Sequence, residues 1–574
     1  MARKREGDDL KLQIVDRNGK KYAYRCTSQM VNGRKRTISE YVGRIDAETG
    51  KILEKRKGRT KAEREKIAAE KRISIRDSFV TKEYGATHFL DLVQRRMHLG
   101  EDLYDSFGTS STTILGIASA MAMSGTNVFM DVGPEFERTD LRNYYDITMS
   151  MDSGSLSEFT YRIGLCASNI DDFYHRRVRR CDTAVAWDTT TQGTYSDVDG
   201  LAEWLSKNKD NEDIRQIKTG IATDVRGIPL FRRHYPATVS DIDTVKEMVN
   251  DLERYECKDY ILAMDRGFVS GANVKYVLGN DIRFVAPALT SSKAIKTILT
   301  RMGRRKCEAR IFDSHAYDVW ETEVGLLLSD TRTSADGGQA FSFTENGSED
   351  HAKDGRLKAF VCFDSKKYSD EVQNHHLMLQ SLTARAETID SPDPVKVFRK
   401  MAGKAVKYFD VAADGRGVRL TVRNNSKSFL ENRAGLFVML TSPDVSWEAM
   451  MAAYDARRLV EQAFDCEKSA DRRFRTGDKT TLEGREFVRF VSLMMKSGIA
   501  AAFREEKLDS KYTVDSALAS LNCINAVSAG GESWLHGMNK SHRTLFEAVG
   551  GRAPKEPEYH HTAAGREYIL ARKG

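Results

Sequence analysis

An acid and two bases share one side of a potential helix near residue 460. The residues on that side, which lie within about 60° of one another at ~100° per residue, are Tyr454, Arg457, Glu461 and Lys468. A carboxylate flanked by cations could hold a metal ion while the cations bind phosphate. An ordinary amphipathic surface helix with an ion pair between Arg457 and Glu461 would show the same pattern.

Two aspartates follow apolar runs that predict short buried strands. The run Thr183–Trp187 leads to Asp188, and the run Tyr260–Met264 leads to Asp265. We expect each aspartate to lie where its strand ends, because functional sites in open α/β sheets are built at that edge. With Glu461, the two aspartates would complete a set of three carboxylates.

The elements that must position these carboxylates follow from the pattern between and after them. A turn at 225–227 separates two alternating runs and predicts a hairpin, and a helix is expected at 241–255. Ser270 can cap a further helix, and a strand is expected at 283–286. The resulting order is β–β–β–α–β–α–β, with the helix that bears Glu461 much later. This order predicts an α/β catalytic core with a ribonuclease H-like mixed sheet.

Several motifs of the chain resemble those of one known family. The spacing of the four residues on the helix side resembles the Y-R-E-K signature of bacterial cut-and-paste DDE transposases of the insertion-sequence-four superfamily. AWDTTT and AMDRGF resemble the two aspartate motifs of that family, and GIPLFRRHYPATVSD resembles the segment between them. The resemblance covers roughly residues 180–500 and is greatest to the branch with large insertions. Two segments depart from the pattern of the family. They are Gly484-Arg485, where the family often has Gly-His, and Cys466-Glu467 beside Lys468.

The resemblance implies a metal-dependent phosphodiester chemistry. It assigns Asp188, Asp265 and Glu461 as catalytic ligands of two Mg²⁺ ions, for which Mn²⁺ would substitute. Two hard cations about 4 Å apart can serve both the attacking and the leaving oxygen. Carboxylates from separate elements suffice as ligands, since Mg²⁺ prefers oxygen and keeps several waters.

Basic and aromatic residues outside the triad are the expected DNA contacts. They are Tyr454, Arg457, Lys468, Arg176, Arg177, Arg179, Arg180, Arg266 and Trp320. The first three would bind a phosphate or stack on a base, with helix packing or salt bridging as the alternative. Arg266 could equally buttress the site, and Trp320 lies in a predicted strand, where a tryptophan is usually a core residue.

The implied function is that of a transposase that binds the terminal inverted repeats of an insertion sequence, cuts DNA and joins it to a target. Its partner would be double-stranded DNA, bound by a homodimer. Two alternatives stay open. One is a repurposed ribonuclease H-fold DNA nuclease, and the other is a catalytically inactive DNA-binding protein derived from a transposase.

Composition agrees with this function without deciding it. Residues 1–80 hold 23 Lys and Arg against 12 Asp and Glu, whereas the whole chain has a net charge of +7. A basic end suits DNA binding, although a solvated tail would have the same composition. The 8 cysteines form no CxxC pair, which favours reduced thiols over a zinc site or disulfides.

No membrane association is expected. The uncharged run 109–130 contains nine Ser, Thr and Asn residues, so we interpret it as a buried helix rather than a membrane span. The start MARKREGDD lacks the apolar region of a signal peptide. We therefore expect a cytoplasmic bacterial protein, associated with the nucleoid when it binds DNA.

The chain is expected to divide into seven regions. These are a small β domain (1–56), a charged helical linker (57–79), a helical DNA-binding domain (80–180), the two parts of the core (181–288 and 436–505) with a β-rich insertion between them (289–435), and a C-terminal helical region and tail (506–574). Two alternatives concern the first half: the linker could be a basic helix along DNA, and the helical region could be a bundle that braces the core.

Overall fold

The structure is a computed structural model that describes residues 11–559 with gaps. The gaps are 18, 32–33, 48, 55–79, 126–127, 182–183, 199, 206–213, 289–294, 297, 300–306, 314, 329–340, 346–354, 469–472, 475 and 530–531. The charged linker expected at 57–79 and the end of the expected C-terminal tail therefore lie outside the described residues.

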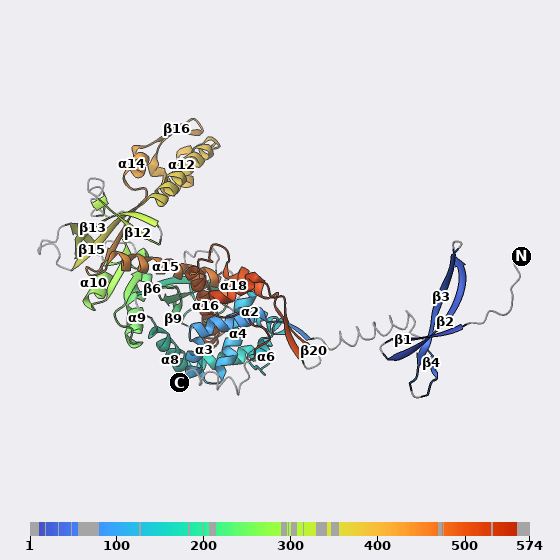
Figure 1. Ribbon diagram of the computed structural model, residues 1–574. Helices are drawn as coiled ribbons and strands as arrows, with labels where there is room; N and C mark the ends of the chain where they lie inside the picture. Colours follow the sequence, from blue (N-terminus) through green and yellow to red (C-terminus); the bar gives the residue numbers. More distant parts are fainter. Residues whose placement is uncertain are drawn as a thin grey trace. The chain divides into compact units, whose positions relative to one another are not determined.

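The chain divides into two compact units, Met1–Val80 with Ser528–Glu532 and Thr81–Val527 with Ser533–Gly574. The first unit contains an antiparallel sheet of β1 (Lys11–Arg17), β2 (Lys20–Val31), β3 (Arg34–Ile45) and β4 (Ile52–Glu54), in that order (Figure 1). The described residues of 1–56, where a small β domain is expected, form this sheet.

The second unit is built around one mixed sheet of 12 strands. They are β6 (Ala184–Thr194), β7 (Glu203–Trp204), β8 (Arg215–Thr223), β9 (Pro229–Pro236), β10 (Ile261–Met264), β11 (Arg283–Pro287), β12 (Glu308–Phe312), β13 (His315–Leu328), β14 (Phe341–Glu345), β15 (Arg356–Asp364), β18 (Leu436–Thr441) and β19 (Arg473–Phe474). The main path runs β12-β13-β15-β18-β11-β10-β6-β8-β7, and β9 pairs with β8. Strands β6, β10 and β11 are parallel, whereas β8 and β18 are antiparallel to their neighbours.

The expected order of elements around the two aspartates is confirmed. The hairpin β8–β9 follows β6, helix α9 (Asp241–Arg254) leads to β10, and helix α10 (Gly271–Gly279) leads to β11. Ser270 caps α10 through its side chain, which accepts a hydrogen bond from the backbone of Asn273. Among the described residues of this segment, the expectation lacked two short elements, the strand β7 (Glu203–Trp204) and the helical turn η1 (Arg266–Phe268). The fold is therefore a mixed α/β architecture, as predicted.

The expectation for the strand before Asp188 is wrong in one respect. Strand β6 does not stop at this residue but continues to Thr194, paired with β8 from Ala186 onward. The three threonines that follow Asp188 are β-branched, and such side chains suit a pleated strand. Asp188 therefore lies inside a strand, beside the point where the shorter β10 ends.

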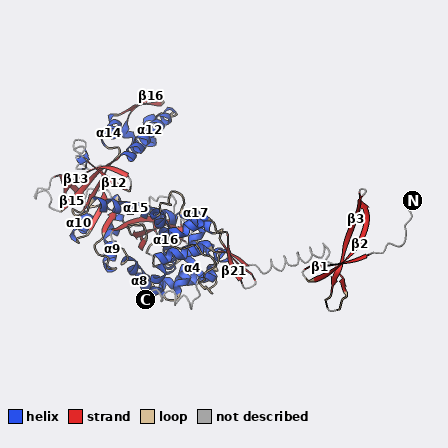
Figure 2. Cartoon of the chain, in the orientation of Figure 1, coloured by secondary structure: helices blue, strands red, loops and turns tan. Residues whose placement is uncertain are grey.

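The long insertion does not form a separate β-rich domain. Strand β15 pairs with β18, and β18 pairs with β11, so the insertion strands β12, β13 and β15 extend the core sheet. The remainder, mostly helical, comprises α12 (Ser365–Glu387), α13 (Pro394–Ala402), η3 (Gly403–Tyr408), the hairpin β16 (Phe409–Asp414) and β17 (Gly417–Val422), and α14 (Asn424–Asn432), which appear together in Figures 1 and 2. It has its own apolar cluster around Phe398 and Phe409.

Residues 80–180 are helical, as expected. Their elements are β5 (Val80–Glu83), α2 (Gly85–Arg96), α3 (Leu99–Phe107), α4 (Ser110–Ser124), α5 (Phe129–Arg138), α6 (Leu141–Tyr144), α7 (Ser153–Leu165) and α8 (Ala167–Val178). The elements after the core are α16 (Lys479–Glu505), α17 (Val514–Leu521), β20 (Asn525–Ala529), β21 (Glu532–His536) and α18 (Lys540–Ala548).

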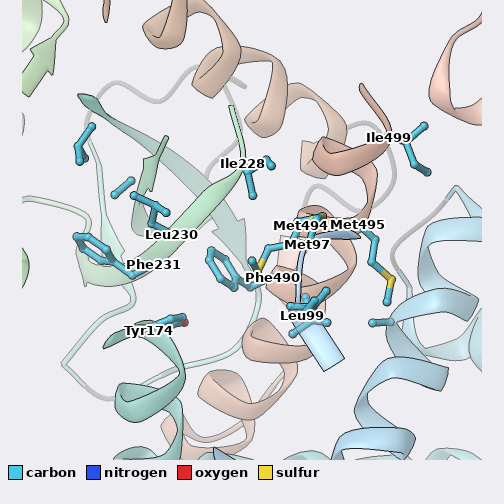
Figure 3. Close-up of a cluster of buried hydrophobic side chains, with 14 of the residues drawn as sticks. Met97, Leu99, Tyr174, Ile228, Leu230, Phe231, Phe490, Met494, Met495 and Ile499 are labelled. Atoms are coloured by element: carbon cyan, nitrogen blue, oxygen red, sulfur yellow. The ribbon is translucent and has the colours of Figure 1, made fainter. Parts of the chain in front are cut away.

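Helix α16 joins the helical region to the sheet. Figure 3 shows Met494 and Met495 of α16 beside Met97 and Leu99, while Phe490 lies near Phe231 of β9. At the crossing of α7 and α16 the backbones touch, since a Cβ on Gly484 would lie 1.8 Å from the carbonyl oxygen of Thr160. The buried packing supports the alternative that the helical region braces the core. A DNA-binding role for this region stays a prediction.

Helix α4 occupies most of the uncharged run and is buried. Its residues Ile114, Ile117, Ala118 and Met121 are fully enclosed in the main apolar cluster, which confirms the interpretation as a core helix. Among the described residues no single helix is long and apolar enough to cross a membrane. The helices α4 and α5 meet that criterion only as a pair bent by 93°.

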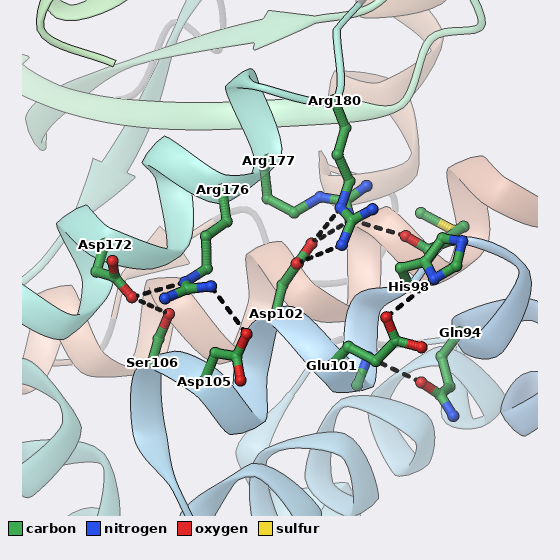
Figure 4. A network of polar contacts seen from close by, with 12 residues as sticks. Gln94, His98, Glu101, Asp102, Asp105, Ser106, Asp172, Arg176, Arg177 and Arg180 are labelled. Atoms are coloured by element: carbon green, nitrogen blue, oxygen red, sulfur yellow. Dashed lines mark hydrogen bonds and ion pairs between the residues drawn. The ribbon is translucent and has the colours of Figure 1, made fainter. Parts of the chain in front are cut away.

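An ion-pair network holds α8, the helix that leads into β6, against α3 (Figure 4). Asp102 of α3 is 2% exposed and accepts hydrogen bonds from Arg177 and Arg180, each at 2.8 Å. Arg177 is 3% exposed and also donates to the carbonyl oxygen of Met97. A second pair, Arg176 with Asp105 at 2.8 Å, lies nearer the surface.

We expect the substitution Asp102→Asn to lower the free energy of unfolding by ~3–5 kcal/mol, since it leaves the buried guanidinium of Arg177 without its counter-charge. The matched substitution Asp105→Asn removes a partly exposed charge from Arg176, which keeps Asp172 as a partner. It should cost about 1 kcal/mol or less. Urea unfolding of the full chain, followed by tryptophan fluorescence, measures both. Equal losses in the two variants would contradict the assignment of Asp102 as the anchor of α8.

Candidate active site

The three carboxylates singled out in the sequence come from three elements that pack together. Residues 184, 186 and 188 share one face of β6 because side chains alternate along a strand. That face is covered by helix α15 (Trp447–Lys468), which carries Glu461 and packs against β6, β10 and β11. Strand β10 is parallel to β6 with Met264 opposite Trp187, so Asp265 follows at the level of Asp188.

Helix α15 is amphipathic as predicted. Ala456, Leu459, Val460 and Ala463 are buried, while Glu461 is exposed. The turn of the hairpin β8–β9 packs against α15 at Leu459. Gly227 in this turn has φ +78°, and a Cβ there would lie 2.6 Å from the Cβ of Leu459. A glycine is required at that turn both for the left-handed backbone and for the close approach.

Arg457 links two of the three carboxylates. Its guanidinium Nη2 lies 3.2 Å from Oδ1 of Asp265 and forms an ion pair with Glu461 one turn further along α15. Its side chain is 17% exposed, and its Nε is buried without a hydrogen-bond partner among the described residues. Arg457 therefore serves as an internal counter-charge for the acidic site.

The proximity of the three carboxylates and the burial of Asp188 affect the pKa of Asp188. Burial, and then the negative charges of Asp265 and Glu461, raise the pKa of Asp188 to about 6. The backbone N–H of Thr189, which donates to Oδ1 of Asp188 at 2.8 Å, and the nearby Arg457 act in the opposite direction. An additional cation among the carboxylates would relieve the repulsion that raises this pKa.

Backbone hydrogen bonds orient the two aspartates, and a fourth acid, Asp241, lies on the other face of β6. Asp265 caps the short helix η1 (Arg266–Phe268) by accepting a hydrogen bond from the backbone N–H of Arg266 at 2.5 Å. On the other face of β6, Thr189 donates to Asp241 at 2.8 Å, and Lys218 pairs with the same oxygen at 2.7 Å. Asp241 was not recognised as a site residue in the sequence, although it ends the motif GIPLFRRHYPATVSD.

The donor chemistry of the site fits a hard divalent cation. Three carboxylates from separate elements offer only oxygen, which is the ligand set that Mg²⁺ prefers. Among the residues that the structure describes, no three acidic, histidine or cysteine side chains converge closely enough to enclose an ion as they stand. The guanidinium of Arg457 lies between Asp265 and Glu461. A metal ion would take the place of this guanidinium, and the carboxylate side chains would then have to reorient to bind the ion.

The remaining expected DNA contacts lie in different surroundings. Tyr454 stacks on Phe437, with ring centroids 6.2 Å apart and an interplanar angle of 16°. Trp320 is half-buried in β13 and packs against the main apolar cluster. Arg266 is exposed beside Asp265. The side chain of Lys468 lies outside the described residues, so its expected role is untested.

The basic run before β6 requires a correction. Arg177 was expected to contact DNA, but it is buried and paired with Asp102, so it cannot reach a phosphate. Arg180 pairs with the same carboxylate, and Arg176 pairs with Asp105 and Asp172. Arg179 is exposed. The sequence could not separate these roles because the acidic partners lie far away along the chain.

Comparisons with known proteins bear on the identity of the site. The family model described as "Transposase DDE domain" matches residues 179–494, which include β6, β10, α15 and most of α16. No curated protein matches the sequence. Among solved structures, the chain is similar to a piggyBac transposase in a synaptic complex with hairpin DNA, at 10% identity over 84% of this chain and 79% of that chain, with a TM-score of 0.30.

The family assignment rests on the sequence match, which contains all three carboxylates and spans more than half of the 574 residues. The chain therefore belongs to the family of transposases with a DDE domain.

Proposed function

We propose that this protein is the transposase of a bacterial insertion sequence, which binds the terminal inverted repeats of its element, cuts the DNA and joins the freed end to a target. The observation that carries the proposal is the meeting of Asp188, Asp265 and Glu461 around Arg457. The Y-R-E-K spacing on α15 supports the insertion-sequence-four branch of the family.

A ribonuclease H-like core is part of this proposal. The strand order β9-β8-β6-β10-β11, with β8 and β9 antiparallel and β10 and β11 parallel to β6, supports it. In that arrangement the central strand and its parallel neighbour bring their aspartates together, and a later helix supplies the glutamate. The insertion between the second aspartate and the glutamate lengthens the sheet without separating them.

Asp188, Asp265 and Glu461 would hold the divalent ions. Two Mg²⁺ ions, or Mn²⁺ in their place, would activate the attacking oxygen and stabilise the leaving oxygen when bound. Arg457, released from Asp265 and Glu461, would bind non-bridging phosphate oxygens, as a guanidinium does readily. Asp241 and Thr189 would keep β6 in place through their hydrogen bond. Tyr454 and Lys468 would contact the DNA on either side.

The proposed reaction has two steps of the same kind. In the first, the oxygen of water attacks phosphorus and the bond from phosphorus to the 3′ oxygen breaks. The water loses a proton and the leaving 3′ oxygen gains one, which yields a 3′-hydroxyl and a 5′-phosphate. In the second, that 3′-hydroxyl attacks a phosphorus of the target DNA and displaces its 3′ oxygen. A homodimer would hold the two ends of the element during this transfer.

The triad is tested by cleavage of a labelled duplex that carries the terminal repeat of the element. We expect Mg²⁺-dependent cleavage by the wild type to fall at least ~10²-fold in Glu461→Gln, the size of effect that follows loss of one preorganised electrostatic group. Glu448→Gln, an exposed position on the same helix, is the matched control and should cleave normally.

The products of this assay separate the candidate functions. Cleavage that leaves a 3′-hydroxyl, followed by joining to a target plasmid, supports the transposase. Cleavage without joining would indicate a repurposed nuclease. Binding without cleavage by either protein, in Mg²⁺ or Mn²⁺, would reject the enzyme and leave a DNA-binding protein.

The counter-charge role of Arg457 makes a prediction about metal-free protein. We expect Arg457→Gln to lower the melting temperature in EDTA, because the three carboxylates lose their internal cation. Added Mn²⁺ should raise that temperature more in the variant than in the wild type, since no guanidinium competes for the carboxylates. Arg458→Gln, whose side chain is exposed and pairs with Asp455, is the control. Equal Mn²⁺ shifts in all three proteins would show that Arg457 and the ion do not share a site.

A further inference from the structure

A basic cleft lies between the sheet and the helical part of the insertion. It has a volume of about 600 Å³ and is lined on one side by Arg266 and on the other by Lys367, Lys407 and Arg433. Aliphatic residues of β11 and β18 form its floor. The proposed reaction uses none of these four cations.

The positive charge of the cleft is not balanced by acidic residues in its lining. Glu371 is the one acid in its lining, and both of its oxygens are engaged: one pairs with Lys367 at 2.9 Å, and the other accepts from the backbone N–H of Gly435 at 2.8 Å. Arg266, Lys407 and Arg433 have no ion-pair partner among the residues that the structure describes. Three positive charges therefore face a cavity with only one acid, which is already neutralised by its own lysine.

The cleft begins at the carboxylates. Arg266 follows Asp265 directly, and Phe437 in the lining is the residue on which Tyr454 of α15 stacks. A phosphodiester held at the triad would thus have its neighbouring phosphates at the entrance of the cleft.

A second cavity continues the same line of charge. It has a volume of about 370 Å³, is lined by Arg399, Arg419 and Arg423, and shares Lys407 with the first. Arg419 and Arg423 form exposed ion pairs with Asp414 and Asp410, contacts that contribute little and that a phosphate can replace. The basic lining therefore extends from Asp265 onto the hairpin β16–β17.

We propose that this cleft binds the phosphates of a single DNA strand that leaves the triad. The inference rests on the proposed function and names the path of its substrate. A cavity of ~300–1,000 Å³ encloses one ligand of moderate size, which corresponds to one or a few nucleotides and excludes two paired strands. Lys and Arg that neutralise phosphates along such a path provide affinity without base preference.

The test measures binding rather than cleavage. The probes are a fluorescent blunt duplex and the same duplex with a short single-stranded extension, both in EDTA, titrated by anisotropy at several salt concentrations. We expect the wild type to bind the extended probe more tightly and with a steeper salt dependence, since each phosphate contact to a single strand adds ~0.7 to the slope. The double variant Lys407→Gln/Arg433→Gln should lose that advantage, with a slope lower by about 1.4, which is ~0.7 for each of the two lost contacts.

The matched control is Lys404→Gln/Arg385→Gln, which removes the same charge from exposed positions of η3 and α12 outside both cavities. It should retain the preference for the extended probe. Two outcomes would overturn the single-strand assignment and leave the proposed function intact. In one, both double variants bind the extended probe with equal affinity. In the other, Lys407→Gln/Arg433→Gln loses affinity for the blunt and the extended probe by the same factor. A wild type that binds neither probe would overturn the proposed function itself.

Discussion

Mutual repulsion among three carboxylates is the constraint around which this molecule is organised. Asp188 is held in a buried strand, Asp265 at the end of a shorter parallel strand, and Glu461 on a helix packed over both. Such a cluster persists only if the surrounding structure imposes it and a cation offsets it. Here the sheet and α15 impose it, and Arg457 supplies the offset.

The rigidity that this requires comes from the buried packing around α16. That helix is enclosed by the helical region on one side and by β9 on the other, and its glycine contact with α7 brings two backbones together. Arg232 of β9 pairs with Glu486 of α16 at 2.7 Å, with both side chains buried. Asp102 fixes the last helix before β6. The helical region thus anchors the segment that leads into β6.

The insertion has a different physical character from the core that it interrupts. Its strands complete the sheet through β18, whereas its helices have a separate apolar cluster and carry uncompensated basic residues toward the triad. An element whose positive charges face a cavity, and not an acidic side chain, is suited to bind a polyanion. The insertion would then help to guide the path of the DNA strand, while the core would carry out the reaction at its phosphate.

The sequence by itself determined the elements near the site and singled out the three carboxylates as candidates, because those signals are local. Periodicity located β8, β9, α9, β10 and α15, and residue spacing singled out Asp188, Asp265 and Glu461. Contacts between distant segments were decided only by the tertiary structure. Arg177 was expected to contact DNA, but it is buried against Asp102, and the strand expected to end at Asp188 continues because β8 pairs with it. Arg457 could be placed on a helix face, but its contact with Asp265 required the sheet. Pairing and burial depend on residues far apart in the chain, and no local pattern records them.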